Sequence, residues 1–138
     1  LLPALVFVIS ALVSFATGTS WGTMGILFPL VVPLAHKMAP GQEAVMLGTI
    51  SSILAGSVWG DHCSPISDTT IMSSLASSCD HIDHVRTQIP YALVVGCVCL
   101  LFGDLACGLG IYNAWMGLLI GAGLLAGVVF LLGKRVDA

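Results

Sequence analysis

Gly60-Asp61-His62-Cys63-Ser64-Pro65-Ile66-Ser67-Asp68 interrupts an apolar segment that runs from residue 44 to residue 78. Pro65 lacks a backbone N–H, so one continuous helix cannot run through this stretch without losing hydrogen bonds. Gly60 suits the end of a first helix, and Asp68 suits the N-cap of a second. We therefore expect residues 44–78 to form a broken helix, in which an unwound loop separates two half-helices.

The composition indicates which solvent surrounds this broken helix. Of the 138 residues, 57% are hydrophobic and 8% are charged, whereas about 25% of the residues in an average soluble domain are charged. Four Lys and Arg against seven Asp and Glu leave no basic surface for the phosphate backbone of a nucleic acid. These values exclude a disordered chain, a nucleic-acid binder and an ordinary soluble enzyme domain. We expect an integral membrane protein whose first partner is the lipid bilayer.

The other apolar stretches predict an all-α membrane fold. A helix of about 20 residues crosses the hydrocarbon core of a bilayer, so residues 89–110 and 113–133 each predict a transmembrane helix. Residues 1–36 are too long for one straight crossing and are interrupted by Thr17-Gly18-Thr19-Ser20-Trp21-Gly22-Thr23. Each arm is too short to cross comfortably, so this segment predicts a re-entrant helical hairpin with a polar tip.

The two interruptions predict one shared polar cavity, because irregular backbone is tolerated inside a bilayer only where protein or water satisfies it. Asp61 and Asp68 lie on the same interruption, and a carboxylate at membrane depth is costly enough to indicate a functional site. Hard cations such as sodium bind the oxygen atoms of carboxylates, hydroxyls and carbonyls. The predicted sodium and proton site consists of Asp61, Asp68, Ser64, Ser67 and Thr69 in the loop and Thr17, Thr19 and Ser20 at the hairpin tip.

A carboxylate that holds either a sodium ion or a proton, but not both, is a simple basis for antiport. Asp61 and Asp68 are the candidates for this exchange. His62 is a further candidate for carrying the proton, because imidazole changes its charge near physiological pH. An equally weighted alternative is that His62 stays neutral and hydrogen-bonds the loop. Sodium and protons are then the transported species, and no cofactor is expected.

Three other polar features fit structural roles better than chemical ones. The number and spacing of the five cysteines match no disulfide or zinc framework. The run Cys79-Asp80-His81-Ile82-Asp83-His84 contains two histidines, but it fits the acidic start of a helix better than a metal site. Asp104, inside a predicted transmembrane helix, either lines a pathway or pairs with a neighbour.

Three motifs, in this order and spacing, resemble those of NhaC-type sodium/proton antiporters of the ion-transporter superfamily. They are Ala16-Thr17-Gly18-Thr19-Ser20-Trp21-Gly22-Thr23, Gly60-Asp61-His62-Cys63-Ser64-Pro65-Ile66-Ser67-Asp68-Thr69-Thr70 and Cys79-Asp80-His81-Ile82-Asp83-His84-Val85-Arg86-Thr87-Gln88-Ile89-Pro90-Tyr91-Ala92. The resemblance implies inverted repeats, each with a re-entrant hairpin and a broken helix. It also implies which residues have the roles of the family's motifs. Those of the hairpin tip are Thr17, Thr19 and Ser20, and those of the broken-helix loop are Asp61, Ser64, Ser67, Asp68 and Thr69.

The resemblance is to the C-terminal portion of such a protein. It implies that a matching N-terminal repeat of the same protein is a partner that these 138 residues lack. The chain starts at Leu1, inside an apolar run and without the charged region that opens a signal peptide, which also suggests a single transmembrane piece, residues 1–138, of a longer transporter. We expect an integral protein of a bacterial inner membrane. The sequence leaves open whether the protein forms a homodimer.

Sodium/proton exchange is the leading functional prediction. Sodium-coupled exchange of a small organic acid or amino acid, such as malate for lactate, is the alternative, because the backbone amides that start the second half-helix suit a carboxylate. A non-transporting assembly subunit is a third interpretation. An enzyme is disfavoured: Ser64 or Ser67 with His62 and Asp61 imitates a catalytic triad, but these residues lie close together in sequence without a nucleophile elbow.

Overall fold

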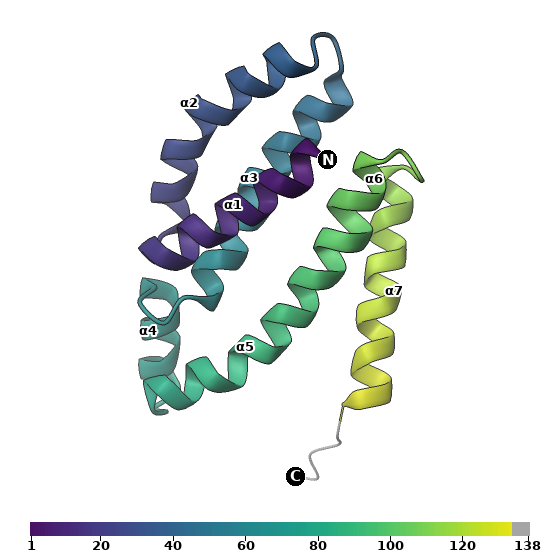
Figure 1. Cartoon of the computed structure of the whole chain (residues 1–138). Helices are drawn as coiled ribbons and strands as arrows, with labels where there is room; N and C mark the ends of the chain where they lie inside the picture. Colours follow the sequence, from purple (N-terminus) through teal and green to yellow (C-terminus); the bar gives the residue numbers. More distant parts are fainter. Residues whose placement is uncertain (134–138) are drawn as a thin grey trace.

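The described part of the chain, residues 1–133 of a computed structural model, has only helices as regular elements (Figure 1). Three helical spans are long and apolar enough to cross a membrane: Glu43–Cys63, His81–Gly108 and Ala114–Leu131. The prediction of an all-helical membrane protein is confirmed at this level. The elements are α1 (Leu2–Thr17), α2 (Ser20–Met38), α3 (Glu43–Cys63), α4 (Asp68–Ala76), α5 (His81–Val98), the π-helical segment η1 (Cys99–Leu105), α6 (Ala106–Gly108) and α7 (Ala114–Leu132).

Helices α1 and α2 are joined by a short turn. Gly18 follows α1 in a left-handed conformation with a φ of 67°, which glycine adopts without steric cost. Thr19 then caps α2, because its hydroxyl accepts a hydrogen bond from the Gly22 N–H at 3.2 Å. Helix α2 therefore begins at Ser20, and much of the polar tip predicted from the sequence is the first turn of a helix rather than a loop.

Helix α3 runs further than the sequence predicted. It continues through Gly60 and ends at Cys63. Gly60 lies inside the helix and allows α1 to pack closely against it. A Cβ at this position would collide with the backbone carbonyl oxygen of Ala11 in α1. The non-helical break is consequently restricted to residues 64–67, before α4 begins.

The start of α4 also differs from the prediction by one residue. Ser67 is the N-cap, and its hydroxyl accepts a hydrogen bond from the Thr69 N–H at 3.3 Å. Asp68, predicted to be the cap, is the first helical residue. A serine hydroxyl and an aspartate carboxylate cap a helix about equally well, so the sequence did not distinguish the two positions.

Helix α1 packs directly against α3. Gly56 faces α1 as Gly60 does, and a Cβ there would collide with the carbonyl oxygen of Phe7. This close approach lets the Ser14 hydroxyl donate to the Ser57 carbonyl at 2.6 Å. An apolar core beside the contact also includes α2, and it consists of Val6, Met24, Leu27 and Ile53. Helices α1, α2 and α3 therefore form one packed unit.

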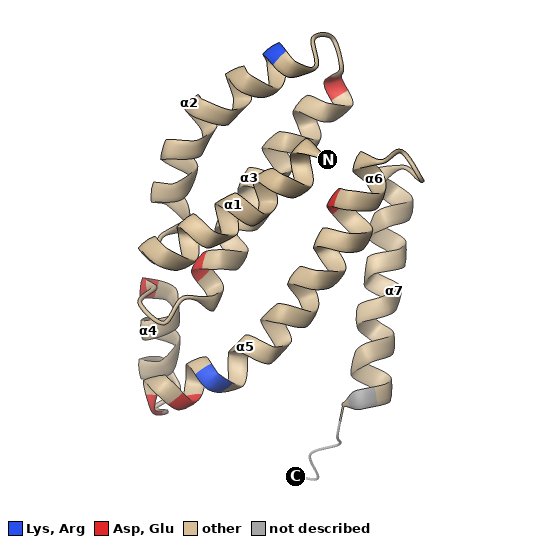
Figure 2. Cartoon of the chain, in the orientation of Figure 1, with Lys and Arg blue, Asp and Glu red and all other residues tan. Residues whose placement is uncertain are grey.

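Helices α5 and α6 and the segment η1 form one continuous span, which crosses beside α3 (Figure 1). Asp80 caps its start by accepting a hydrogen bond from the Ile82 N–H at 2.9 Å. The Trp59 indole N–H donates to the Ala92 carbonyl at 2.7 Å and ties α3 to α5. Asn113 caps the last helix, α7. Figure 2 shows that charged positions are few in the described residues and that most lie near helix ends.

Candidate functional site

Asp61 is a buried carboxylate beside the break. It lies in the last turn of α3 and is 7% exposed. The Ser67 hydroxyl donates to its Oδ1 at 2.7 Å. Because this bond uses the only proton of the Ser67 hydroxyl, the 2.8 Å contact between the Ser67 and Thr69 hydroxyls is donated by Thr69. The structure thus brings three of the predicted site residues into one chain of oxygen atoms.

The hairpin turn lies against this loop. Ser64 is fully buried, and its hydroxyl donates to the Phe15 carbonyl of α1 at 2.8 Å. Gly18 is so close to Ile66 that a Cβ on Gly18 would lie 2.9 Å from the Ile66 carbonyl oxygen. The two interruptions are therefore neighbours in space, which is what the shared cavity expected from the sequence requires.

The hydroxyls of the hairpin tip bond within their own hairpin. Thr17 donates to the Val13 carbonyl at 2.9 Å, and its hydroxyl lies 3.3 Å from that of Thr23. Thr19 caps α2, and Ser20 is the half-buried first residue of that helix. The tip therefore approaches the loop through its backbone at Gly18, while the hydroxyls of Thr17 and Thr19 have local partners.

Asp68 does not share the position of Asp61. It is exposed in the first turn of α4, where a carboxylate interacts favourably with the positive end of the helix dipole. Ser67 occupies the capping position that the sequence assigned to Asp68. The structure therefore does not bring the two predicted carboxylates into one buried cluster.

Two residues of α5 brace the break, and the sequence analysis did not assign this role to either. The Nε2 of His81 lies 2.7 Å from the Pro65 carbonyl oxygen, which can only accept, so this nitrogen carries the proton. The Nδ1 of His81 lies 3.2 Å from the Ser74 hydroxyl of α4. Gln88 donates to the His62 carbonyl at 2.8 Å. His81 and Gln88 are about two helical turns apart and so lie on one face of α5, which was the only signal in the sequence.

The Cys79–His84 run forms the start of a helix rather than a metal centre. Asp80 caps α5, and His81 bonds to the loop. Within residues 1–133, no group of three His, Cys, Asp or Glu side chains is arranged to hold a metal ion. The five cysteines are free thiols.

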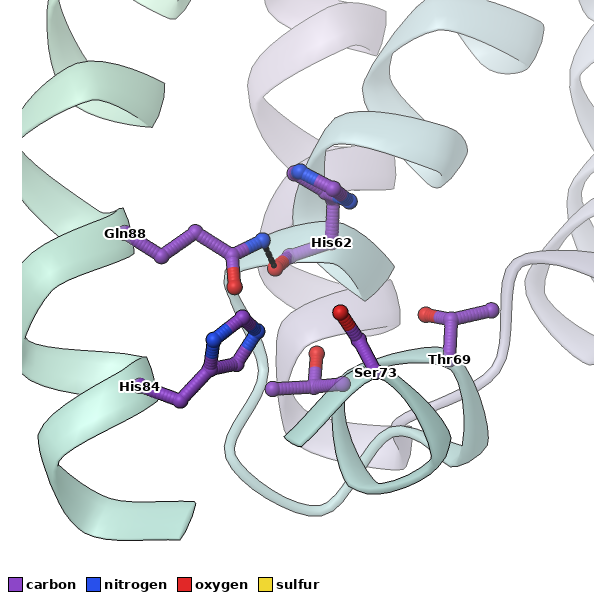
Figure 3. A pocket seen from close by; sticks show the side chains of 6 residues that line it. His62, Thr69, Ser73, His84 and Gln88 are labelled. Carbon is purple, nitrogen blue, oxygen red and sulfur yellow. Dashed lines mark hydrogen bonds between the residues drawn. The ribbon is translucent and has the colours of Figure 1, made fainter. Parts of the chain in front are cut away.

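A cavity of about 190 Å³ adjoins the Asp61 chain of oxygen atoms at Thr69 (Figure 3). Figure 3 shows Ser73 of α4 and His84 of α5 extending into the same space. Thr69 belongs both to the lining and to the chain that ends at Asp61. The lining residues are His62, Thr69, Thr70, Ser73, His84 and Gln88.

Asp104 lies apart from this site, in η1. The hydroxyl of Ser52, a fully buried residue of α3, donates to its Oδ1 at 2.9 Å. The nearby Tyr112 hydroxyl donates to the Phe102 carbonyl of the same π-helical segment at 2.6 Å. Of the two roles that the sequence allowed, the structure shows the pairing of Asp104 with a neighbour.

Comparison with known proteins agrees with this membrane architecture. A model of the Na+/H+ antiporter family matches residues 1–108. An uncharacterized protein of Haemophilus influenzae is 52% identical over 94 residues, which cover 68% of this chain and 18% of that protein. An uncharacterized Na+/H+ antiporter of the same organism is 34% identical over 102 residues, which cover 69% of this chain and 20% of that protein.

A third relative is named for a different exchange. The arginine/ornithine antiporter ArcD of Halobacterium salinarum is 38% identical over 104 residues, which cover 72% of this chain and 21% of that protein. The chain thus spans about a fifth of the length of these curated relatives. No solved structure matches it.

The matched residues contain the hairpin, the break and the long span that follows it. Three helical spans are long and apolar enough to cross a bilayer, and two of the relatives are named as antiporters. The chain is therefore part of an integral membrane protein of a transporter family. The chain belongs to the Na+/H+ antiporter family.

Proposed function

We propose that the protein is an NhaC-type secondary antiporter that exchanges sodium for protons across a bacterial inner membrane. The observation that carries this proposal is the buried Asp61 carboxylate at the break, hydrogen-bonded to Ser67 at 2.7 Å. The family description and the name of one relative support the choice of ions.

The chemistry of the break suits a small cation. In this proposal sodium binds the Asp61 carboxylate together with the hydroxyl oxygens of Ser64, Ser67 and Thr69, and the C-terminal end of α3 adds its partial negative charge. A proton on Asp61 removes the negative charge and therefore displaces the sodium ion. One carboxylate that holds one cation at a time couples the two fluxes without any cofactor.

The other predicted residues have supporting roles. Thr17, Thr19 and Ser20 shape the hairpin tip whose backbone lies against the loop. Asp68 adds negative charge at the exposed start of α4, where it attracts cations toward the site. We propose that His62, an exposed residue next to Asp61 in sequence, carries protons between the ion site and water.

We also propose that α1 and α2 form a re-entrant hairpin. Helix α1 has 16 residues, fewer than the roughly 20 that cross the hydrocarbon core. Pro29 and Pro33 lie inside α2 and remove backbone hydrogen bonds there. In an inverted-repeat transporter, an N-terminal repeat of the same protein supplies the other half of the cavity, and a homodimer is compatible with this arrangement.

Sodium-coupled exchange of a small organic acid or amino acid is the second candidate. A relative that is 38% identical is named an arginine/ornithine antiporter. The cavity of about 190 Å³ that Thr69 shares with the proposed ion site offers a place for a solute.

Liposomes that contain the protein and a pH-sensitive dye distinguish these functions. If the protein is a sodium/proton exchanger, an imposed sodium gradient moves protons with no organic solute present. If proton movement requires an added organic acid or amino acid, the second candidate is correct.

Asp61→Asn tests the ion site in the same assay. We expect this variant to abolish the exchange, because a neutral amide neither binds a proton nor compensates a cation. Asp83→Asn is the matched control, since Asp83 is an exposed residue of α5. Full exchange by Asp61→Asn would exclude Asp61 as the ion-binding carboxylate.

A further inference from the structure

The hydroxyl of Ser52, a fully buried residue of α3, faces two hydrogen-bond acceptors. Its oxygen lies 2.8 Å from the carbonyl oxygen of Gly48, one turn earlier in α3, and 2.9 Å from Oδ1 of Asp104 in η1. A serine hydroxyl has only one proton to donate, while a carbonyl and an ionised carboxylate can only accept. When Asp104 is ionised, Ser52 can therefore satisfy only one of these two short oxygen contacts fully.

A protonated Asp104 satisfies both contacts. The carboxyl O–H then donates to the Ser52 oxygen, and the Ser52 hydroxyl donates to the Gly48 carbonyl. The direction of the bond between Ser52 and Asp104 thus depends on the protonation of the carboxyl. Because each oxygen contact then contains one proton, the neutral form of Asp104 fits this arrangement better than the ionised form.

The position of Asp104 also favours its neutral form. It lies within His81–Gly108, a span long and apolar enough to cross a membrane, and a charged side chain inside a bilayer is costly. The side chain is half-buried, so the described residues do not seal it off from protons. Asp104 belongs to the π-helical segment η1, and such segments occur frequently at functional sites.

The helices that pack against η1 offer few charges to Asp104. Helices α1 and α7 contain no titratable or charged side chain. On α3, Glu43 and Asp61 are each nine residues from Ser52, or about 13.5 Å along the helix axis. No carboxylate or cationic side chain of these three helices therefore lies in the turn that faces Asp104.

The titratable side chains beside Asp104 on its own span are the thiols of Cys99 and Cys107, which are neutral at neutral pH. The hydroxyl of Tyr112 is neutral as well and donates to a backbone carbonyl of η1. The amino group of Leu1 faces Gly108, one helical turn beyond Asp104. That amino group is the neighbour that would favour an ionised Asp104, and it defines the competing outcome of the test.

We propose that Asp104 and Ser52 form a second proton-binding site, in which the Asp104 carboxyl carries a proton and donates a hydrogen bond to Ser52. The distance along α3 between Ser52 and Asp61 keeps this site separate from the proposed ion site. Loss of the proton leaves two acceptors to the single proton of Ser52 and so weakens the contact between η1 and α3. The inference goes beyond the proposed function, because this site binds a proton whether or not sodium is exchanged at Asp61.

Infrared spectroscopy of the purified protein at neutral pH tests the proposal. A protonated carboxyl group has a C=O stretching band that an ionised carboxylate lacks. We expect Asp104→Asn to lose one such band, and the difference from the unchanged protein separates it from any signal of Asp61. The amide N–H of the variant donates to Ser52 as the carboxyl O–H does, so the packing is retained. Asp83→Asn, at an exposed position in α5, is the control and should keep the band.

Ser52→Ala tests the hydrogen bond itself. This variant removes the acceptor of the Asp104 O–H and leaves the helix backbone intact. We expect the Asp104 band to move to a higher frequency, because a carboxyl group absorbs there when its O–H has lost its acceptor. Ser51→Ala is the matched control, since Ser51 is the exposed neighbour of Ser52 in α3, and it should leave the band in place.

Two results would overturn the proposal. The absence of a band that depends on Asp104 would show that its carboxylate is ionised, and an unmoved band in Ser52→Ala would show that Asp104 does not donate to Ser52. The liposome exchange assay separates this proposal from the proposed function. If sodium moves protons but Asp104 gives no band, only the second proton site is wrong. If Asp104 gives the band but the unchanged protein moves no protons, only the proposed exchange is wrong.

Discussion

Ser67 donates a hydrogen bond to Asp61 across the break, with 2.7 Å between the hydroxyl oxygen and Oδ1. The same hydroxyl accepts a hydrogen bond from the Thr69 N–H at 3.3 Å and so caps α4. One side chain therefore fixes both the orientation of the buried carboxylate and the start of the helix that follows. The geometry of the proposed ion site and the local stability of α4 depend on the same residue.

Ser67→Ala is expected to lower the free energy of unfolding by about 2–4 kcal/mol. Loss of the cap accounts for about 1 kcal/mol, and the unpartnered buried carboxylate for about 1–3 kcal/mol. The measurement is the melting temperature of the protein in detergent, with Ser67→Thr expected to recover most of the loss. Ser77→Ala removes an exposed hydroxyl at the other end of α4, and an equal loss in that variant would contradict the explanation.

Gly18→Ala is expected to separate the hairpin turn from the loop. A Cβ on Gly18 would lie 2.9 Å from the Ile66 carbonyl oxygen, and the residue has a φ of 67°. Gly41 is the matched control, because its φ is 77° but a Cβ there meets nothing within 4 Å. Both variants carry the cost of a left-handed alanine, about 1–2 kcal/mol, and only Gly18→Ala adds a collision.

The readout for this pair is sodium affinity in the liposome exchange assay, together with the melting temperature. We expect Gly41→Ala to lower stability slightly and to keep the sodium affinity. Gly18→Ala should lower both, because the turn and the loop can no longer be in contact. The same sodium affinity in the two variants would show that the contact between turn and loop is irrelevant to the ion site.

His81→Ala is expected to loosen residues 64–67. It removes the 2.7 Å bond to the Pro65 carbonyl and the 3.2 Å contact with Ser74. Hydrogen exchange of the backbone amides in this loop, followed by mass spectrometry, should become about tenfold faster, as expected for the loss of one buried hydrogen bond. His36→Ala, at an exposed position near the end of α2, should leave the exchange rate of the loop amides unchanged. The same unchanged rate in His81→Ala would contradict the proposed role of His81 in bracing the loop.

The break itself was predictable from the sequence, because Pro65 removes a backbone donor within a polar stretch that also offers helix caps at Ser67 and Asp68. Proline alone does not break a helix in this chain, since Pro29 and Pro33 lie inside α2. The boundaries of the break were not predictable. A glycine such as Gly60 suits either a helix end or a close helix contact, and only the position of α1 shows that it serves the contact. Ser67 and Asp68 are both good caps, so local chemistry left that choice open as well.

The candidate site was predictable only in part, because several of its contacts join residues far apart in sequence. Asp61, Ser67 and Thr69 belong to one short stretch, and the structure joins them. The brace from His81 and the cavity between α4 and α5 depend on how α5 folds back beside the break. An unpartnered hydroxyl such as that of Thr70 has no signature in a sequence, since its burial is decided by the neighbouring helices.

Gly60→Ala is expected to disrupt the packing of α1 on α3, because the added Cβ collides with the Ala11 backbone, which cannot move without shifting the helix. We expect a loss of stability of more than about 1–3 kcal/mol, the usual cost of overpacking with flexible neighbours. Gly25→Ala is the control, since a Cβ at this exposed position in α2 meets nothing within 4 Å and alanine favours a helix by up to about 1 kcal/mol. Melting temperatures in detergent should therefore move in opposite directions, and a rise in both would show that α1 and α3 are not packed as closely as the structure has them.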